Sequence, residues 1–492
     1  MSISLLYRTE ATLPNVGKVG KDTLAQLAVE KITRRLGLPR SDARYFEQIL
    51  SAPLIDPKDI SYRSQALYAF SEHPDLLDRL TDSFGRLEQL KSDFENLKKE
   101  KRQLQRSVSG EAIPEAAKNH LRVSAMLFKR CLVWSKATRD IVDSYELNSE
   151  ALTRLQEELQ AVSAEGAFEE LCTLCSQLER FSEASGTALA IELNEFGLFV
   201  SAQIMDRHQI LFQKPHEKKK KRWFSRQEEE APVAVAPISL AYNSLSPKLR
   251  AEAMTSLARL LDRMTQQLFA RFLPIDRELS FYRSGVKYLR CLQEKGIPYC
   301  QAEMAENNVL SFEELCDPLL LLYNDDPKSV VANSLPAHPA TGIAVFGSNG
   351  SGKTVWLRSV GLCCLFAQAG LPIPAKSARI SPYRQILSHF STAEKEFEAG
   401  NEAGRFEQEV REMALIVDEI GDDSLVLLNE TFQTTAYAQG AVGLSPILRY
   451  LASRGCRWIL TSHLTQLLDQ FTSEETLICK TDSKFAVKVM NA

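Results

Sequence analysis

Eight consecutive residues carry the side chains and the backbone needed to hold a triphosphate. Positions 347–354 have the sequence G-x-x-x-x-G-K-T, in which glycines let successive backbone N–H groups point toward phosphate oxygens. Lys353 adds positive charge for the β- and γ-phosphates, and the hydroxyl of Thr354 can ligate Mg²⁺. The residues expected to contact the nucleotide are Gly347, Ser348, Asn349, Gly350, Ser351, Gly352, Lys353 and Thr354.

The segments on either side of this loop have the patterns of the elements that must position it. Residues 341–346 form a short apolar run fit for a buried strand, and residues 355–368 carry apolar side chains at helical spacing. Strand, glycine loop and helix N-terminus together cradle phosphates, whereas a chance glycine-rich turn would lack this context. The sequence therefore predicts an α/β P-loop NTPase domain.

Two apolar runs end in an acidic pair, and either pair could supply a hydrolytic carboxylate. The first run ends in Asp418 and Glu419, but the apolar residues around it fall on one face of a helix that begins near Arg405. That face comprises Phe406, Val410, Met413, Ile416 or Val417, and Ile420. The second run, residues 424–430, is short and rich in Val and Leu, as a buried parallel strand is. We therefore expect Asp418 and Glu419 to be exposed near a helix end, and Glu430 to follow a strand.

Composition limits the classes of protein to consider. A chain of 492 residues allows about three domains, and its 44% hydrophobic and 25% charged residues are typical of a globular protein. No apolar run reaches membrane-spanning length, and residues 1–10 lack the pattern of a signal peptide. The ten cysteines are scattered, which favours a reduced, cytoplasmic chain. With a net charge of −4, any surface for nucleic acid must be local.

Helical periodicity dominates the residues that precede the loop. Apolar residues recur at steps of three and four from residue 41 to about residue 106, where Gly110 and Pro114 interrupt them. Further helical stretches are expected over residues 115–185 and 246–296. The domain boundaries are expected to give residues 1–40 as an N-terminal segment, 41–110 as a helical core, 111–245 as an arm, 246–299 as a returning lever helix and 300–492 as the ATPase domain.

Two other segments differ from the helices. Alternation over residues 188–204 predicts a small β-hairpin. Residues 214–226 hold seven Lys or Arg residues interleaved with Trp223 and Phe224, which suits either a contact with nucleic acid or a solvated linker. If residues 145–185 and 246–296 pair as antiparallel arms, the hairpin and this basic loop lie at their far end.

The predicted ATPase domain resembles that of the MutS family of DNA-processing ATPases. Residues 288–299 and the pair Asp317-Pro318 are similar to the family's approach to this domain, although the family has a histidine where Asp317 stands. Residues 49–63 resemble the start of the family's helical core, so the likeness covers roughly residues 40–480. It implies an ABC/MutS-like fold preceded by a mostly α-helical core with long lever helices. About forty residues precede the core, so we expect the family's mismatch-reading domain to be absent.

The resemblance assigns roles to residues of the site. Glu430 stands where the family polarises the attacking water, and Asn429 stands where an aspartate helps to hold Mg²⁺ through water. An amide keeps the oxygen but loses the charge, so we expect weaker metal binding with slow turnover, or ATP that is bound and barely hydrolysed. His463, after the apolar strand 459–462, matches a switch histidine that senses the γ-phosphate. Val330 stands where the family has an aromatic residue that stacks on adenine.

The resemblance also implies a function and its partners. It indicates an ATP-dependent DNA-binding protein that forms a homodimer through its ATPase domains and rearranges long arms on DNA, without reading mismatches. Gly404 and Arg405 replace a serine and a threonine that reach the γ-phosphate across the dimer, and Arg405 could act there as an arginine finger or remain a solvated charge. The alternative is a nucleotide-gated scaffold or interaction protein with weak or no hydrolysis and no DNA binding, which the net charge of −4 and the altered ATPase motifs support. ABC-type transporter ATPases are the alternative P-loop class, although we expect no membrane partner.

Overall fold

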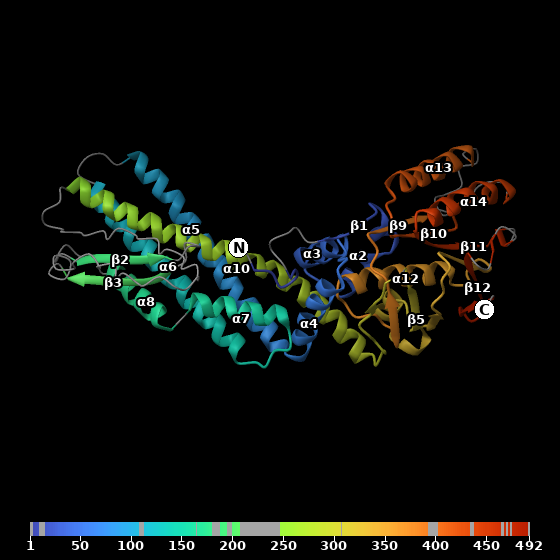
Figure 1. Ribbon diagram of the computed structural model, residues 1–492, viewed down its shortest axis with the longest axis horizontal. Coiled ribbons are helices and arrows are strands. Elements are labelled where there is room, and N and C mark those ends of the chain that lie inside the picture. The colour runs from blue at the N-terminus through green and yellow to red at the C-terminus, as the bar shows by residue number, and fades with distance from the viewer. Residues whose placement is uncertain are drawn as a thin grey trace, which may run out of the picture. The chain divides into compact units, whose positions relative to one another are not determined.

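The computed structural model of the protein describes residues 3–8, 15–107, 113–163, 165–179, 187–193, 199–206, 247–306, 308–391, 402–432, 437–463, 467–468, 471–472 and 475–490. The chain divides into two compact units, which are described separately (Figure 1). The first unit comprises residues 1–3, 75–147 and 152–276, and the second comprises residues 4–74, 148–151 and 277–492. The second unit therefore includes both the early helical residues and residues 300–492.

The first unit consists mainly of helices. Its elements are α5 (Pro74–Ser107), α6 (Ile113–Asp143), most of α7 (Glu150–Val162), α8 (Glu165–Glu179), β2 (Thr187–Leu193), β3 (Phe199–Asp206) and the first part of α10 (Pro247–Glu294). Strands β2 and β3 pair antiparallel, with an irregularity between Glu192 and Leu193, which confirms the predicted hairpin. Helix α8 packs against α6 and against β3. The residues of the predicted basic loop, 214–226, lie outside the described residues.

Aromatic side chains hold the helices of the first unit together. The ring of Trp134 lies 5.4 Å from that of Phe84 and 5.5 Å from that of Phe272, measured between ring centroids. Such edge-to-face pairs add about 0.5–1.5 kcal/mol each beyond the burial of their apolar area. Helix α10 thus packs on α5 and α6, and an ion pair between Arg271 and Glu158 links it to α7. The pairing of residues 145–185 with residues 246–296 as two arms stays a prediction.

The second unit begins with the helices α1 (Thr23–Gln26), α2 (Val29–Arg35), α3 (Arg40–Leu50) and α4 (Pro57–Glu72). Of these, α3 and α4 pack on the last part of α10. The start of α4 follows from its sequence, because Pro57 fits the first helical position and the carboxylate of Asp56 accepts a 2.8 Å hydrogen bond from the backbone N–H of Lys58. Phe46 of α3 stacks on Phe281 of α10 at 5.8 Å. These contacts attach the early helices to the same body as the ATPase region.

A seven-stranded sheet forms the centre of the second unit. Its strands are β1 (Lys18–Val19), β7 (Gly342–Phe346), β9 (Gln385–Phe390), β10 (Ser424–Asn429), β11 (Arg457–Ser462), β12 (Thr476–Thr481) and β13 (Val487–Val489). The spatial order is β1-β9-β10-β11-β7-β12-β13, and every neighbouring pair is parallel except β12 and β13. Strand β1 comes from the part of the chain that we expected to be a separate N-terminal segment. The register places Asn429 beside Thr461 and Ser462 beside Phe346, so the carboxyl ends of the central strands meet at one edge.

Helices cover both faces of this sheet (Figure 1). Helices α13 (Glu402–Glu419) and α14 (Tyr437–Ser453) pack on the face that carries Val426 and Leu428, through residues such as Met413 and Leu448. Because side chains alternate along a strand, Leu427 points to the other face, where it meets α12 (Lys353–Gln368). At Gly361 of α12 a Cβ atom would lie 2.5 Å from Leu427, so a glycine is required for this close approach. The predicted α/β P-loop fold is confirmed.

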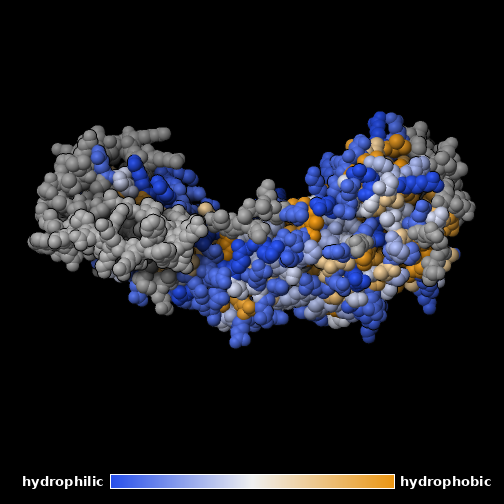
Figure 2. All heavy atoms as spheres, in the orientation of Figure 1, coloured by the Kyte–Doolittle hydropathy of each residue, from blue (hydrophilic) through white to orange (hydrophobic). Residues whose placement is uncertain are grey.

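A smaller sheet and two short helices complete the second unit. The sheet has the order β4 (Glu303–Met304), β8 (Ser377–Ile380), β5 (Leu310–Leu315) and β6 (Asn333–Leu335), and the helices are α11 (Pro318–Tyr323) and η2 (Pro327–Ser329). Among the residues that are coloured, Figure 2 shows a mainly hydrophilic surface with separate apolar areas. Within the described part of the chain, no helix has the length and apolar character needed to cross a membrane.

Candidate nucleotide-binding and hydrolytic site

The phosphate loop runs from the end of β7 to the start of α12. Strand β7 is buried along its whole length because it lies between β11 and β12. Gly350 and Gly352 have positive φ angles of +76° and +88°, and Gly352 caps the N-terminus of α12. A side chain at either position would strain the backbone, which accounts for the glycines of the motif. The predicted strand, loop and helix are confirmed, and the helix begins at Lys353.

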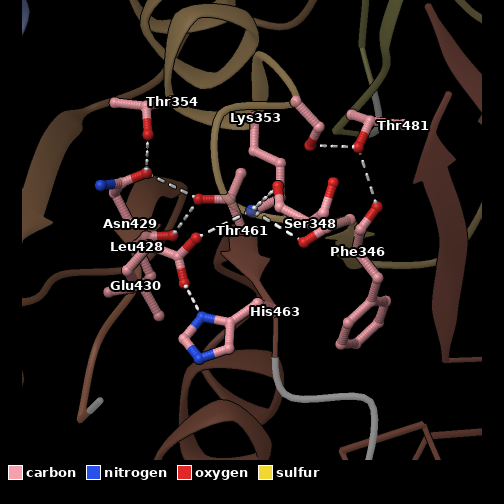
Figure 3. A network of polar contacts seen from close by, with 12 residues as sticks. Phe346, Ser348, Lys353, Thr354, Leu428, Asn429, Glu430, Thr461, His463 and Thr481 are labelled. Atoms are coloured by element: carbon pink, nitrogen blue, oxygen red, sulfur yellow. Dashed lines mark hydrogen bonds and ion pairs between the residues drawn. The ribbon is translucent and has the colours of Figure 1, made fainter. Parts of the chain in front are cut away.

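Lys353 is fixed at the centre of the loop (Figure 3). Its ammonium group donates to the carbonyl oxygens of Gly347 and Ser348 at 2.9 and 3.0 Å and pairs with the carboxylate of Glu430 at 3.0 Å. The lysine side chain is 4% exposed, so these three contacts compensate for a charge that has been removed from water. An anion entering the loop would therefore compete with Glu430 for the same ammonium group.

Three side-chain oxygens converge next to the start of α12. The Oδ1 atom of Asn429 accepts hydrogen bonds from the hydroxyl groups of Thr354 and Thr461, both at 2.9 Å (Figure 3). Thr354 is exposed, whereas Asn429 is buried at the end of β10. Oxygen ligands of this kind suit Mg²⁺, so the two residues predicted to hold the metal do lie together and fit it, with an amide in place of a carboxylate. The contribution of Thr461 was not predicted.

Glu430 and His463, which were predicted to take part in hydrolysis, lie next to each other. Glu430 directly follows β10 and has a positive φ of +53°, a conformation that is unfavourable for a residue with a side chain and that is common at functional sites. One carboxylate oxygen of Glu430 faces Lys353, and the other accepts a 2.9 Å hydrogen bond from Nδ1 of His463. The side chains of Glu430 and His463 are 15% and 26% exposed, so solvent reaches them. Of the three residues predicted to be catalytic, Lys353 and His463 thus each contact Glu430.

The other acidic pair lies where the helical pattern predicted it. Asp418 and Glu419 are exposed in the last turn of α13. Met413 and Ile420 are buried against the sheet as expected, but Val410 is 41% exposed, so the predicted apolar face is wrong at that residue. Neither Asp418 nor Glu419 follows a strand, whereas Glu430 directly follows β10.

Asp317 has a structural role that sequence reasoning missed. Its carboxylate caps α11 by accepting a 2.7 Å hydrogen bond from the backbone N–H of Leu320. The same carboxylate accepts two bonds from the guanidinium group of Arg358, at 3.0 and 3.1 Å, and one from the hydroxyl of Ser359 at 3.2 Å. Because Arg358 lies one helical turn after Thr354 on α12, this buried ion pair fixes α11 to the helix that follows the phosphate loop.

A second unpredicted contact holds the loop to β12. The hydroxyl groups of Ser351 and Thr481 lie 2.6 Å apart, and Thr481 also donates to the carbonyl oxygen of Phe346 at 3.3 Å (Figure 3). At Gly347 a Cβ atom would collide with the Thr481 side chain. The first glycine of the motif is therefore required by the neighbouring strand as well as by the phosphates.

A buried histidine links α13 to the turn after Glu430. His389 of β9 contacts the hydroxyl of Thr431 through Nδ1 at 3.0 Å and the carboxylate of Glu412 through Nε2 at 3.1 Å. Ser391 donates to the carboxylate of Glu409, also on α13, at 2.5 Å. Burial lowers the pKa of His389 below its usual value of 6.5, although Glu412 and Glu409 oppose this shift. The imidazole of His389 thus connects α13 to the turn that follows Glu430.

Three other residues were predicted to belong to the site, and no contact with its other residues is described for them. Val330 is buried at the end of η2, where it can offer apolar contact but no ring. Gly404 and Arg405 lie near the start of α13, and the side chain of Arg405 is outside what the structure describes. The roles proposed for Val330 and Arg405 remain predictions.

The part of the chain that forms this site is similar to known proteins. Residues 343–489 match the family described as MutS domain V. Endonuclease MutS2 of Pelotomaculum thermopropionicum is 35% identical over 128 residues, which are 26% of this chain and 16% of the relative. The probable DNA mismatch repair protein Msh6 of Drosophila melanogaster is 33% identical over 131 residues, which are 27% of this chain and 11% of the relative. Endonuclease MutS2 of Streptococcus thermophilus is 29% identical over 233 residues, or 46% of this chain and 28% of the relative. The chain thus spans less than a third of each of these relatives.

Proposed function

We propose that this chain, whose residues 343–489 match MutS domain V, is a member of the MutS family and an ATPase that acts on DNA. It binds ATP with Mg²⁺ at the phosphate loop, hydrolyses the ATP slowly, and uses the bound nucleotide to change its affinity for DNA. The proposal is supported by one observation: five side chains lie in contact with one another or with a shared neighbour at the edge where the parallel strands end. They are Lys353, Thr354, Asn429, Glu430 and His463.

Binding would rearrange the contacts of Lys353. Its ammonium group exchanges the carboxylate of Glu430 for oxygens of the β- and γ-phosphates, while backbone N–H groups of the loop and of the start of α12 surround the phosphates. Thr354 and Asn429 would hold Mg²⁺, which supplies positive charge to the phosphate oxygens. Because Asn429 is neutral, this pair attracts the cation less than a threonine and an aspartate would.

Hydrolysis would use the carboxylate that Lys353 has released. Glu430 accepts a hydrogen bond from a water molecule and orients it toward the γ-phosphorus, while His463 keeps the other carboxylate oxygen in place. The water adds to phosphorus as the bond to the bridging oxygen breaks, which yields ADP and phosphate. Positioning and charge account for most of the catalysis of phosphoryl transfer, so the weak metal site slows turnover without preventing it.

We further propose that the protein forms a homodimer through its ATPase domains. Helix α13 exposes Val410 and Leu415 to solvent, at 41% and 62%. A second copy of the chain would cover such side chains. Arg405, near the start of the same helix, would then be available to the nucleotide of the partner.

The DNA part of the proposal draws on relatives that are named as an endonuclease and as a probable DNA mismatch repair protein. A second candidate function, a nucleotide-gated scaffold that does not bind DNA, is favoured by the net charge of −4 and by Asn429 in the metal site. The two differ in one measurable property, because a protein that neutralises DNA phosphates must lose affinity as salt rises.

A salt titration of DNA binding tests the proposal. The affinity of the protein for a fluorescent DNA duplex and for a branched DNA is measured by anisotropy from about 50 to 200 mM salt. We expect log affinity to fall linearly with log salt concentration. Undetectable binding to both DNAs at the lowest salt would favour the scaffold, and ATP hydrolysis measured in parallel would show whether the nucleotide site is active on its own.

A further inference from the structure

Two unfavourable backbone conformations flank one buried threonine directly after β10. Glu430 has a φ angle of +53° and Phe432 one of +61°, in the left-handed region that residues with side chains rarely adopt. Such conformations persist only where the surrounding structure holds them. The backbone N–H of Glu430 donates to the carbonyl oxygen of Thr461 at 2.9 Å, which fixes the start of the turn. Thr431 is 3% exposed, so its contacts decide how the rest of the turn is held.

The hydroxyl group of Thr431 contacts a histidine on the neighbouring strand. Its Oγ1 atom lies 3.0 Å from Nδ1 of His389. In the parallel register of β9 and β10, His389 stands opposite Leu428, which packs on the face of the sheet that α13 and α14 cover. Residues that are opposite each other in neighbouring strands point to the same face. The imidazole therefore lies between the sheet and α13, two residues before Glu430 in the register.

A carboxylate on α13 fixes the hydrogen-bonding role of each imidazole nitrogen. Nε2 of His389 lies 3.1 Å from one oxygen of Glu412, and the other oxygen accepts a 2.9 Å hydrogen bond from Gln408. An ionised carboxylate only accepts hydrogen bonds, so Nε2 carries the proton and Nδ1 of the neutral ring accepts from the hydroxyl of Thr431. Burial lowers the pKa of His389 and favours this neutral ring, although Glu412 and Glu409 oppose the shift. The directions of both hydrogen bonds thus depend on Glu412.

We propose that His389 is a positioning residue for hydrolysis, which holds the turn of Glu430 through Thr431 and ties that turn to α13 through Glu412. The inference rests on the proposed function and adds a means of regulating it. The side chain of Glu412 is 45% exposed, so the outer end of this line of contacts is open to whatever binds α13. In the proposed homodimer, a displacement of α13 would therefore reach the hydrolytic carboxylate through three side chains.

The first test removes only the hydroxyl group of Thr431. Valine has nearly the shape of threonine without the hydroxyl, and serine keeps the hydroxyl. Single-turnover ATP hydrolysis and affinity for a non-hydrolysable ATP analogue are measured for the wild type, Thr431→Val and Thr431→Ser. Because a misplacement of about 1 Å can cost on the order of 100-fold in rate, we expect Thr431→Val to hydrolyse ATP at least about tenfold more slowly. Its analogue affinity should be no weaker than that of the wild type, and Thr431→Ser should resemble the wild type.

Substitutions of the imidazole separate its two contacts. Asparagine places its amide near the position of Nδ1, whereas glutamine places its amide near that of Nε2. We therefore expect His389→Gln, which can reach Glu412 but not Thr431, to slow hydrolysis as much as Thr431→Val does. His389→Asn should retain more of the rate. The reverse order of the two rates would contradict a role that acts through Thr431.

A double substitution shows whether the effect passes through Glu430. Thr431→Val is combined with Glu430→Gln, and the residual single-turnover rate is measured. If Thr431 acts only by placing the carboxylate, Thr431→Val should slow the wild type but leave the residual rate of Glu430→Gln unchanged, because groups that act as a unit are not additive. The same fold-loss in both backgrounds would show that the contact merely stabilises the fold, and would overturn the inference.

The link to α13 is tested at the exposed end of the line, where a substitution does not disturb the core. Glu412→Ala removes the acceptor for Nε2, and Glu412→Gln keeps an amide oxygen that can accept. Asp418→Ala, at the exposed end of the same helix, is the matched control. We expect Glu412→Ala alone to slow hydrolysis several-fold, and a wild-type rate in this variant would refute the link.

The outcomes separate this inference from the proposed function. If the wild type hydrolyses ATP and Thr431→Val does so at the same rate, the positioning role fails while the ATPase stands. If the wild type binds the analogue but does not hydrolyse ATP, the proposed hydrolysis fails and takes the positioning role with it.

Discussion

The ion pair between Lys353 and Glu430 leads to a prediction about the variant Glu430→Gln. In the structure, Glu430 holds the ammonium group that ATP must engage, at a distance of 3.0 Å. Glutamine has the same shape but no charge, so it releases Lys353 more readily and does not repel the phosphates. The variant should therefore bind ATP more tightly at the same time as it loses hydrolysis.

The size of the effect can be worked out from this contact. At 3.0 Å, Coulomb's law with an effective dielectric constant of about 20 gives an attraction of about 5.5 kcal/mol. Desolvation offsets most of this, and the net contribution of a hydrogen bond between charged groups is about 1.5–3 kcal/mol. Because the glutamine amide can still contact Lys353, we take the lower end, which corresponds to about tenfold tighter binding. The loss of a group that activates the attacking water should slow hydrolysis by about 100-fold or more.

Two measurements check this prediction with a matched control. The affinity for a non-hydrolysable ATP analogue and the rate of single-turnover hydrolysis are measured for the wild type, Glu430→Gln and Glu419→Gln. Glu419→Gln makes the same chemical change on the exposed end of α13, so both of its values should match the wild type. Unchanged or weaker analogue binding by Glu430→Gln would refute the competition for Lys353. Loss of hydrolysis in Glu419→Gln alone would show that the wrong acidic pair has been chosen.

Three further predictions follow from neighbouring contacts. Lys353→Ala should abolish ATP binding and hydrolysis while the fold remains, and wild-type affinity for a labelled ATP analogue would show that the site is elsewhere. Asn429→Asp adds a charge where Thr354 and Thr461 converge, so half-maximal hydrolysis should require several-fold less Mg²⁺, and an unchanged Mg²⁺ titration would exclude the position from the metal site. Burial lowers the pKa of His389 in the folded state, so the unfolded chain binds the proton more readily. The stability that the neutral imidazole contributes is complete above its usual pKa of 6.5 and is lost as pH falls through the lowered value. Denaturant titrations at pH 7.5 and 5.5 should show a smaller loss of stability on acidification for His389→Asn than for the wild type, and an equal loss would remove His389 as a cause.

The core of the site could be predicted because its signals are local. The loop of residues 347–354 specifies its own conformation through glycines at positive φ, and the apolar run before Glu430 is too short and too uniformly apolar for a surface helix. The helical spacing around Met413 likewise placed Asp418 on a helix. In each case, one stretch of sequence contains both the pattern and the residue it positions.

The missed features depend on contacts between distant parts of the chain. Thr461 bonds to Asn429 because the register of β10 and β11 places them opposite each other, and sequence periodicity does not give the register between strands. Asp317 meets Arg358 only after α11 has packed on α12. Strand β1 has two residues, too few for a periodic signal, yet it joins the sheet beside β9. The exposure of Val410 was missed for a similar reason, since a helical pattern does not show how wide a face its neighbours cover.

The central claim is that nucleotide bound at the ATP site changes the affinity of the protein for DNA. It is tested most directly by measuring DNA affinity with and without nucleotide. Binding of a fluorescent DNA is titrated at a single low salt concentration, with and without a non-hydrolysable ATP analogue, for the wild type and Lys353→Ala. Because coupling between two ligands must be reciprocal, the analogue should shift DNA affinity in the wild type and DNA should shift analogue affinity by the same factor. Lys353→Ala should bind DNA with an affinity that the analogue leaves unchanged. DNA affinity that is unaffected by nucleotide in the wild type, or absent altogether, would contradict the claim.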